Sequence, residues 1–76
     1  MTSIPMVNME KTGENIVHLR QTRGLSVKDI QKEFGFVTPQ AIYKWQQGNA
    51  LPTIDNLVVL AEIFQVPIDD ILVVNH

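Results

Sequence analysis

The feature that most constrains this fold is the regular spacing of glycine and proline along the chain. Gly24, Gly35, Gly48 and Pro67 divide 76 residues into short stretches, each with apolar residues at helical spacing. Apolar residues make up 45% of the chain, which is typical of a globular domain and not of a disordered tail. The pattern predicts a single all-α domain, a compact five-helix bundle.

Capping residues mark where these helices begin. The expected helices run over about 12–23, from the cap Ser26 to Gly35, from the cap Thr38 to Gly48, from the cap Thr53 through residue 64, and from Pro67 onward. We expect an N-terminal arm at 1–11, loose or paired as a short strand, a domain over 12–74 and a C-terminal end at 75–76.

The fourth expected helix is the most apolar one. Its inner face is predicted to contain Ile54, Leu57, Val58, Leu60, Ala61 and Phe64. In the third helix, Trp45 shares its spacing with Ala41 and Ile42, which predicts a core tryptophan and not an exposed stacking platform.

Several kinds of chemistry are excluded by what the chain lacks. It has no cysteine, and its two histidines, His18 and His76, are far apart, so no Cys- or His-spaced metal site is available. Asp69 and Asp70 are explained by the dipole of the last helix, and Ser3 and Ser26 have no nucleophile context. We expect no enzymatic activity, no metal, no cofactor and no small-molecule substrate.

No segment predicts a leader or a membrane span. The longest apolar run, residues 57–61, is too short to cross a bilayer. We therefore expect a cytoplasmic protein with no membrane partner.

Charge is divided unevenly along the chain. Residues 1–48 hold all six basic residues against four acidic ones, whereas residues 49–76 hold Asp55, Glu62, Asp69 and Asp70 and no basic residue. A polyanion should therefore meet the first part of the chain and be repelled by the second.

The segment from Ser26 to Gly48 has the order of a helix-turn-helix: cap, helix, glycine turn, cap, helix. The outer face of its second helix carries Gln40, Tyr43, Lys44 and Gln47. Glutamine and lysine can hydrogen-bond to base edges, and a tyrosine ring can contact a thymine methyl group. This pattern predicts a recognition helix, although a merely solvated face would have the same composition.

Phosphate contacts are expected at the helix starts near Ser26 and Thr38. Backbone N–H groups at a helix N-terminus attract anions, and Lys28 and Lys32 add positive charge nearby.

The stretch 14–72 also resembles a known family. Arg23-Gly24-Leu25-Ser26, Gly35, Ile42-Tyr43-Lys44-Trp45, Gly48, Pro52 and Asp69-Asp70-Ile71-Leu72 follow the order seen in lambda repressor/Cro-type (XRE) helix-turn-helix domains. The resemblance implies a five-helix domain that binds operator DNA, usually as a dimer. It implies base contacts from Gln40 and Lys44, with Pro39 and Tyr43 at the groove. It also implies contacts to one phosphate strand from Ser26, Val27 and Lys28, and to the other from Asn49.

Three positions depart from the family pattern. Phe36 and Val37 both stand between Gly35 and Thr38, so the turn is one residue longer, and we expect one of them to fill the widened junction. Gln31 replaces the usual alanine. Gln46 replaces a glutamate that commonly pairs with the arginine of the first helix, here Arg20, and a weaker neutral hydrogen bond is the expected substitute.

These observations predict a sequence-specific regulator of transcription, most simply a repressor, that binds double-stranded DNA as a homodimer. The apolar tail at 71–74 either closes the core or forms the dimer interface with the arm around Ile4, Met6 and Val7. The alternative is a protein-interaction module of the same fold that binds another regulator or a toxin-like partner through its acidic, apolar second part.

Overall fold

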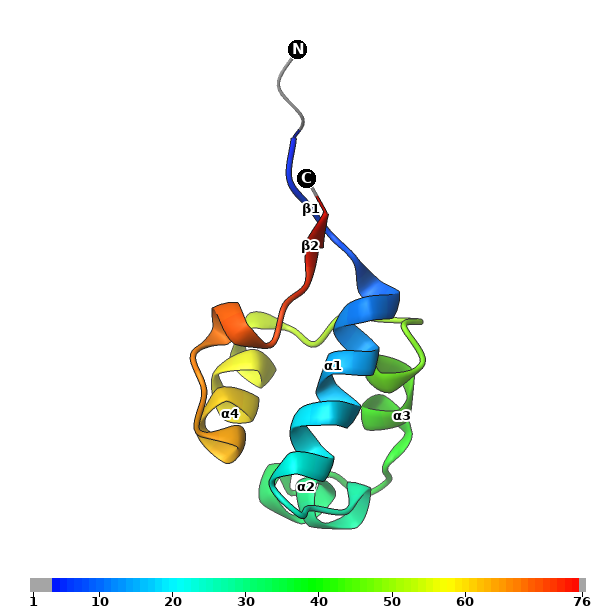
Figure 1. Cartoon of the computed structure of the whole chain (residues 1–76). Helices are drawn as coiled ribbons and strands as arrows, with labels where there is room; N and C mark the ends of the chain where they lie inside the picture. The colour runs from blue at the N-terminus through cyan, green and yellow to red at the C-terminus, as the bar shows by residue number, and fades with distance from the viewer. Residues whose placement is uncertain (1–3, 76) are drawn as a thin grey trace.

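The computed structural model describes residues 4–75 and shows α1 between α3 and α4, with α2 across one end (Figure 1). Residues 1–3 of the expected arm, with Ser3, and His76 of the expected C-terminal end lie outside the described residues. The elements follow in the order β1 (Met6–Val7), α1 (Met9–Thr22), α2 (Val27–Phe34), α3 (Gln40–Gln46), α4 (Ile54–Phe64), the 3-10 turn η1 (Ile68–Asp70) and β2 (Val74–Asn75).

The starts of α2 and α4 are confirmed as capped. The Ser26 hydroxyl accepts from the backbone N–H of Asp29, and the Thr53 hydroxyl accepts from that of Asn56, at 3.0 and 3.3 Å. At its end, α2 stops at Gly35, whose φ of +70° is the left-handed conformation that glycine adopts without strain.

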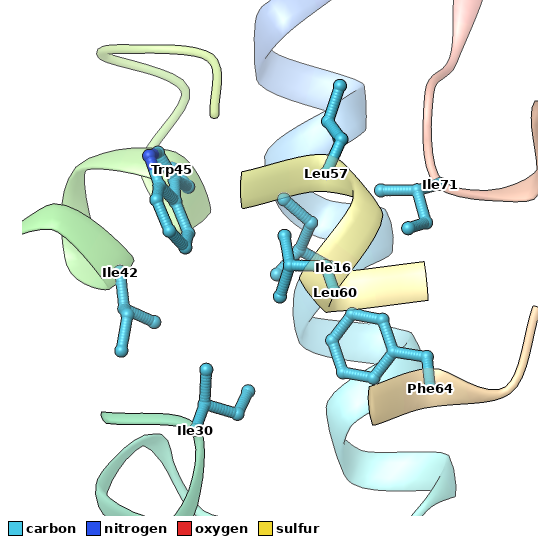
Figure 2. Close-up of a cluster of buried hydrophobic side chains, with 8 residues drawn as sticks. All are labelled: Ile16, Ile30, Ile42, Trp45, Leu57, Leu60, Phe64 and Ile71. Carbon is cyan, nitrogen blue, oxygen red and sulfur yellow. The ribbon is translucent and has the colours of Figure 1, made fainter. Parts of the chain in front are cut away.

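The core lies where α1, α2, α3 and α4 meet, and Figure 2 shows its side chains. Trp45 is 4% exposed, which confirms it as a core residue. The buried apolar side chains are Ile16, Ile30, Ile42, Trp45, Leu57, Leu60, Phe64 and Ile71.

Two residues expected inside α4 lie on its surface. Ile54 is 77% exposed and Val58 is 55% exposed, so the prediction that they belong to the inner face is wrong. Helical spacing predicts a wide apolar face on α4, but the neighbouring elements cover only part of that face. Only Leu57, Leu60 and Phe64 are buried in this helix.

The five-helix count is also wrong, because residues 4–75 form four α-helices, the short turn η1 and a pair of strands. Pro67 is extended, and only residues 68–70 follow it in 3-10 form. The Asn15 side-chain amide donates to the carbonyls of Asp70 and Ile71 at 2.6 and 2.9 Å. A continuing helix would use those carbonyls, so α1 diverts the chain into an extended path.

The N-terminal arm forms a short strand. β1 pairs antiparallel with β2, with Met6 opposite Asn75 and Val7 opposite Val74. The first helix starts three residues before the predicted Thr12, because Asn8 caps it by accepting from the Lys11 N–H at 2.8 Å. Within residues 4–75, no helix is long and apolar enough to span a bilayer.

Candidate nucleic-acid interface

The two faces of α3 differ sharply in exposure. The buried residues are Ile42 and Trp45. The exposed residues are Gln40, Tyr43, Lys44 and Gln47, and Tyr43 is 45% exposed to solvent. Helical spacing places these four polar side chains on one outward face. The structure therefore brings together the four non-proline base-contact candidates, while Pro39 lies half-buried at the start of the helix.

Packing against α1 fixes the position of α3. Gly13 of α1 is buried, and a Cβ atom there would clash with the backbone carbonyls of Trp45 and Gln46. No residue larger than glycine permits this close approach, so Gly13 determines how deeply α3 sits on α1. Sequence reasoning missed this role, and the signal was a glycine inside a helical pattern.

A polar contact joins the same two helices. The Arg20 guanidinium donates from Nε to the Gln46 side-chain oxygen at 3.0 Å and from Nη1 to the Leu25 carbonyl at 2.9 Å. The expected hydrogen bond between Gln46 and Arg20 is thus confirmed, with the neutral amide oxygen of Gln46 as acceptor. Arg20 links α1, the loop before α2 and the C-terminal end of α3.

The longer turn between α2 and α3 is closed by Gln31 and Phe36. Gln31 donates its side-chain amide to the carbonyls of Phe36 and Val37, both at 3.2 Å. The Phe36 ring stacks on Phe34 with 4.7 Å between centroids and meets the edge of Trp45 at 6.1 Å. Phe36 therefore fills the junction, and Gln31 satisfies the backbone of the extra turn residue.

Val37 takes the opposite position and is 93% exposed at the tip of the turn. It lies two residues before Pro39 and so next to the start of α3. Sequence reasoning treated it only as a filler, but its exposure adds an apolar side chain to the edge of this surface. The extra residue in the turn is the sequence feature that indicates an outward side chain here, because Phe36 alone fills the junction.

The expected cap of α3 is wrong. Pro39, and not Thr38, occupies the N-cap position, and no side chain caps the helix. The φ of Pro39, fixed near −85°, lets the chain enter the helix directly after it. Thr38 is exposed, and its hydroxyl is left for other contacts at this surface.

The start of α2 is already occupied by its own capping box. The Ser26 N–H donates to the Asp29 carboxylate at 2.8 Å, and these bonds from Ser26 hold the pKa of Asp29 below its usual value. The carboxylate therefore stays charged where a phosphate was expected. Ser26 keeps only its hydroxyl proton for a phosphate, while Val27 is half-buried and Lys28 is exposed.

At the other end of α3, Asn49 and Gln47 form one pair. The Asn49 side-chain amide donates to the Gln47 side-chain oxygen at 3.1 Å. Because the Gln47 side-chain oxygen faces Asn49, the N–H groups of the same Gln47 amide point away from Asn49. The bond also limits the rotamers of both side chains. The structure thus joins a candidate base contact to a candidate phosphate contact.

Comparison with known proteins identifies the family and the fold. A family model described as helix-turn-helix matches residues 16–71. The chain belongs to the XRE-type helix-turn-helix family. Members of this family are DNA-binding regulators of transcription. A search of curated protein sequences found no match.

Two solved structures share the fold of this helix-turn-helix protein. The DNA-binding domain of BldD from S. venezulae superposes with a TM-score of 0.73 at 22% identity, covering 87% of this chain and 97% of that one. A crystal structure of the DNA-binding domain of BldD gives the same TM-score and identity, with 94% of that chain covered.

Proposed function

We propose that this protein is a sequence-specific DNA-binding regulator that inserts α3 into the major groove of a pseudo-palindromic operator. The observation that carries the proposal is the outward face of α3, where Gln40, Tyr43, Lys44 and Gln47 are exposed directly opposite the buried Ile42 and Trp45. This face belongs to the second helix of a helix-turn-helix, the element that reads base edges in such domains.

Each side chain has a distinct role in the proposed complex. Gln40 is suited to pair with adenine and Lys44 to donate to guanine, while the Tyr43 ring contacts a thymine methyl group or gives its hydroxyl to a phosphate. Pro39 and Val37 supply apolar contact at the start of α3. Gln47 reads a base through the amide that Asn49 orients.

Phosphates are bound on either side of α3. Lys28 supplies a positive charge, and the hydroxyls of Ser26 and Thr38 donate hydrogen bonds. Val27 contributes backbone and packing at the start of α2, and Asn49 lies at the opposite flank. The acidic residues that follow, Asp55, Glu62, Asp69 and Asp70, are all exposed and keep DNA away from α4 and η1.

The test is selection of random duplex DNA by the purified protein at physiological ionic strength. Recovery of a motif with two half-sites about one helical turn apart, ~34–36 Å, is expected for a dimeric reader of a pseudo-palindrome. Absence of any enriched motif from a folded protein would refute the proposal.

Variants then assign bases to side chains. Gln40→Ala and Lys44→Ala should each weaken binding to the selected site by about 1–3 kcal/mol and relax preference at one position. Lys28→Ala should weaken all duplexes alike and flatten the dependence on salt. Lys11→Ala is the matched control, because Lys11 is an exposed lysine on α1 that is not one of the proposed DNA contacts. A loss of sequence preference in Lys11→Ala would contradict the assignment.

The regulator acts as a repressor in this proposal, since an operator covered by the protein is closed to polymerase. It binds as a homodimer, because one domain with so few basic residues gains affinity when two half-sites are engaged together. Expression of a reporter whose promoter contains the selected site should fall in the presence of the protein. With the Lys44→Ala variant in its place, expression should return. Activation of that reporter would contradict repression while leaving DNA binding intact.

One observation favours the alternative of a protein-interaction module. Ile54 and Val58 form an exposed apolar surface on α4, and a shallow hollow beside them is lined by Val58, Ala61, Val66 and Ile68. Exposed apolar surface with polar residues at its rim, here Glu62 and Gln65, is typical of a protein contact. DNA affinity without sequence preference that vanishes near ~0.1 M salt would support this second function.

A further inference from the structure

The β1–β2 ribbon stands away from the helical body, beyond the end where α1 begins (Figure 1). Apolar side chains in and just before the ribbon are exposed: Ile4, which precedes β1, is 81%, Met6 67%, Val7 38% and Val74 39% exposed. An isolated two-stranded ribbon is only marginally stable in water, because it has no third strand or helix to cover its apolar side chains.

The ribbon is nevertheless held firmly at its base. The Val73 N–H donates to the buried Thr12 hydroxyl at 2.9 Å, and the Asn8 N–H donates to the Val73 carbonyl at 2.7 Å. The Asn8 side chain also donates to that of Asn75 at 3.3 Å. These bonds fix β2 in an extended form before any partner arrives, which lowers the entropy cost of binding one.

The hydrogen-bond alternation of the ladder directs one set of backbone groups outward. Because Asn8 and Val73 bond across the ribbon, the next pair, Val7 and Val74, points its N–H and C=O groups to the open edges. On the β1 edge the adjoining outward residue is Pro5, which has no N–H to donate. The edge of β2 around Val74 has no proline in the described chain and can accept another strand.

Charge favours a second copy of this chain as that strand. Neither 4–8 nor 71–75 contains a charged residue, so two ribbons meet without repulsion. Another exposed apolar surface, Ile54 and Val58 on α4, lies among Asp55 and Glu62, and a two-fold contact there would bring like charges together. Of these two surfaces, the ribbon is the one compatible with self-association.

We infer that the ribbon is the self-association surface of the protein. The β2 strand of one copy pairs antiparallel with β2 of a second copy around Val74, giving a four-stranded sheet in the order β1-β2-β2-β1. The antiparallel arrangement is isologous, because the same Val74 lies at the two-fold axis in both copies. This inference rests on the proposed function only in naming the interface of the proposed dimer.

The chain has no cysteine, so a single introduced thiol reports one contact unambiguously. We would compare Val74→Cys with Ile54→Cys under mild oxidation, without DNA, and measure the disulfide-linked dimer on non-reducing gels. Random collision favours Ile54→Cys, since Ile54 is the more exposed position. Ribbon pairing predicts the reverse, with Val74→Cys cross-linking faster by about tenfold or more because pairing raises the local thiol concentration.

Equal rates, or faster cross-linking of Ile54→Cys, would overturn the inference. A second pair of variants gives a test without oxidation. Val74→Lys places like charges opposite each other at the axis and should shift sedimentation toward the monomer, whereas Ile54→Lys should not. A Val74→Lys protein that remains as dimeric as the unaltered chain also overturns it. DNA is absent from both tests, so their failure leaves the proposed DNA binding untouched.

Discussion

Replacement of Gln31 by alanine should loosen the turn that leads into α3. The side chain of Gln31 makes two hydrogen bonds, to the Phe36 carbonyl and to the Val37 carbonyl, and the first of these is partly buried. Gln31→Ala removes both donors while keeping a residue that favours helix at this position of α2.

The magnitude follows from the number and burial of these bonds. A typical hydrogen bond contributes about 0.5–1.5 kcal/mol net, and the exposed bond to Val37 belongs at the low end because water replaces it. Alanine recovers a few tenths of a kcal/mol through its helix propensity. We therefore expect the free energy of unfolding to fall by about 1–1.5 kcal/mol, which lowers Tm by roughly 4–12 °C in a domain of this size.

The assay is urea unfolding followed by tryptophan fluorescence. Trp45 is the single tryptophan and packs against Phe34 and Phe36, so its emission reports the core beside the altered turn. Gln21→Ala is the matched control, because Gln21 is an exposed glutamine on α1, where surface changes stay within about 0.5 kcal/mol.

Gln31→Glu sharpens the test. A carboxylate would face the same two carbonyl oxygens, so the variant should be less stable than Gln31→Ala at neutral pH. The pKa of that carboxyl would be raised in the folded protein, and stability should return on acidification as the protonated group donates again. The reasoning is refuted if Gln31→Ala matches the Gln21→Ala control, or if Gln31→Glu shows no recovery at low pH.

Two further predictions concern the helix junctions. Gly13→Ala should lower the free energy of unfolding by about 3 kcal/mol, since the new methyl group meets backbone carbonyls of α3 that cannot move aside; urea unfolding would show this, and an unchanged midpoint would contradict the close approach. Asp29→Asn should lower Tm at neutral pH but not well below pH 3.8, because a lowered carboxyl pKa adds stability above that value and loses it as pH falls. A Tm difference that is equal at both pH values would show that the Asp29 charge does not matter.

Local signals in the sequence were sufficient for most of the helix-turn-helix. The capping box of Ser26 and Asp29 and the turn at Gly35 depend on neighbouring residues, so short-range chemistry predicts them correctly. The outward face of α3 follows from helical period once Ile42 and Trp45 are placed inside. The polar candidates Gln40, Tyr43, Lys44 and Gln47 are therefore available from the sequence, although their contacts with DNA remain a prediction.

Some expectations fail where a distant segment competes with local preference. The first helix is expected to start at Thr12, but Asn8 caps it earlier, and the Thr12 hydroxyl instead accepts from the Val73 N–H, 61 positions away in the chain. Asn15 likewise donates to the carbonyls of Asp70 and Ile71. This contact prevents the α-helix that Pro67 predicts at the end of the chain. No local pattern contains these pairings, because their partners are joined only when the chain has folded.

The sequence alone thus determines the capped starts of α2 and α4, the end of α2 at Gly35 and which residues of α3 face outward, because hydrogen bonds and periodicity act within a few residues. The tertiary structure decides the rest. Gly13 sets the depth of α3, Gln31 holds the longer turn while Val37 points out, and β1 and β2 pair as a ribbon with an open edge. The close approach at Gly13 and the pairing of the strands depend on segments far apart in the chain, which only packing of the whole core brings together, whereas Gln31 bonds to a turn five and six residues away once that turn has folded.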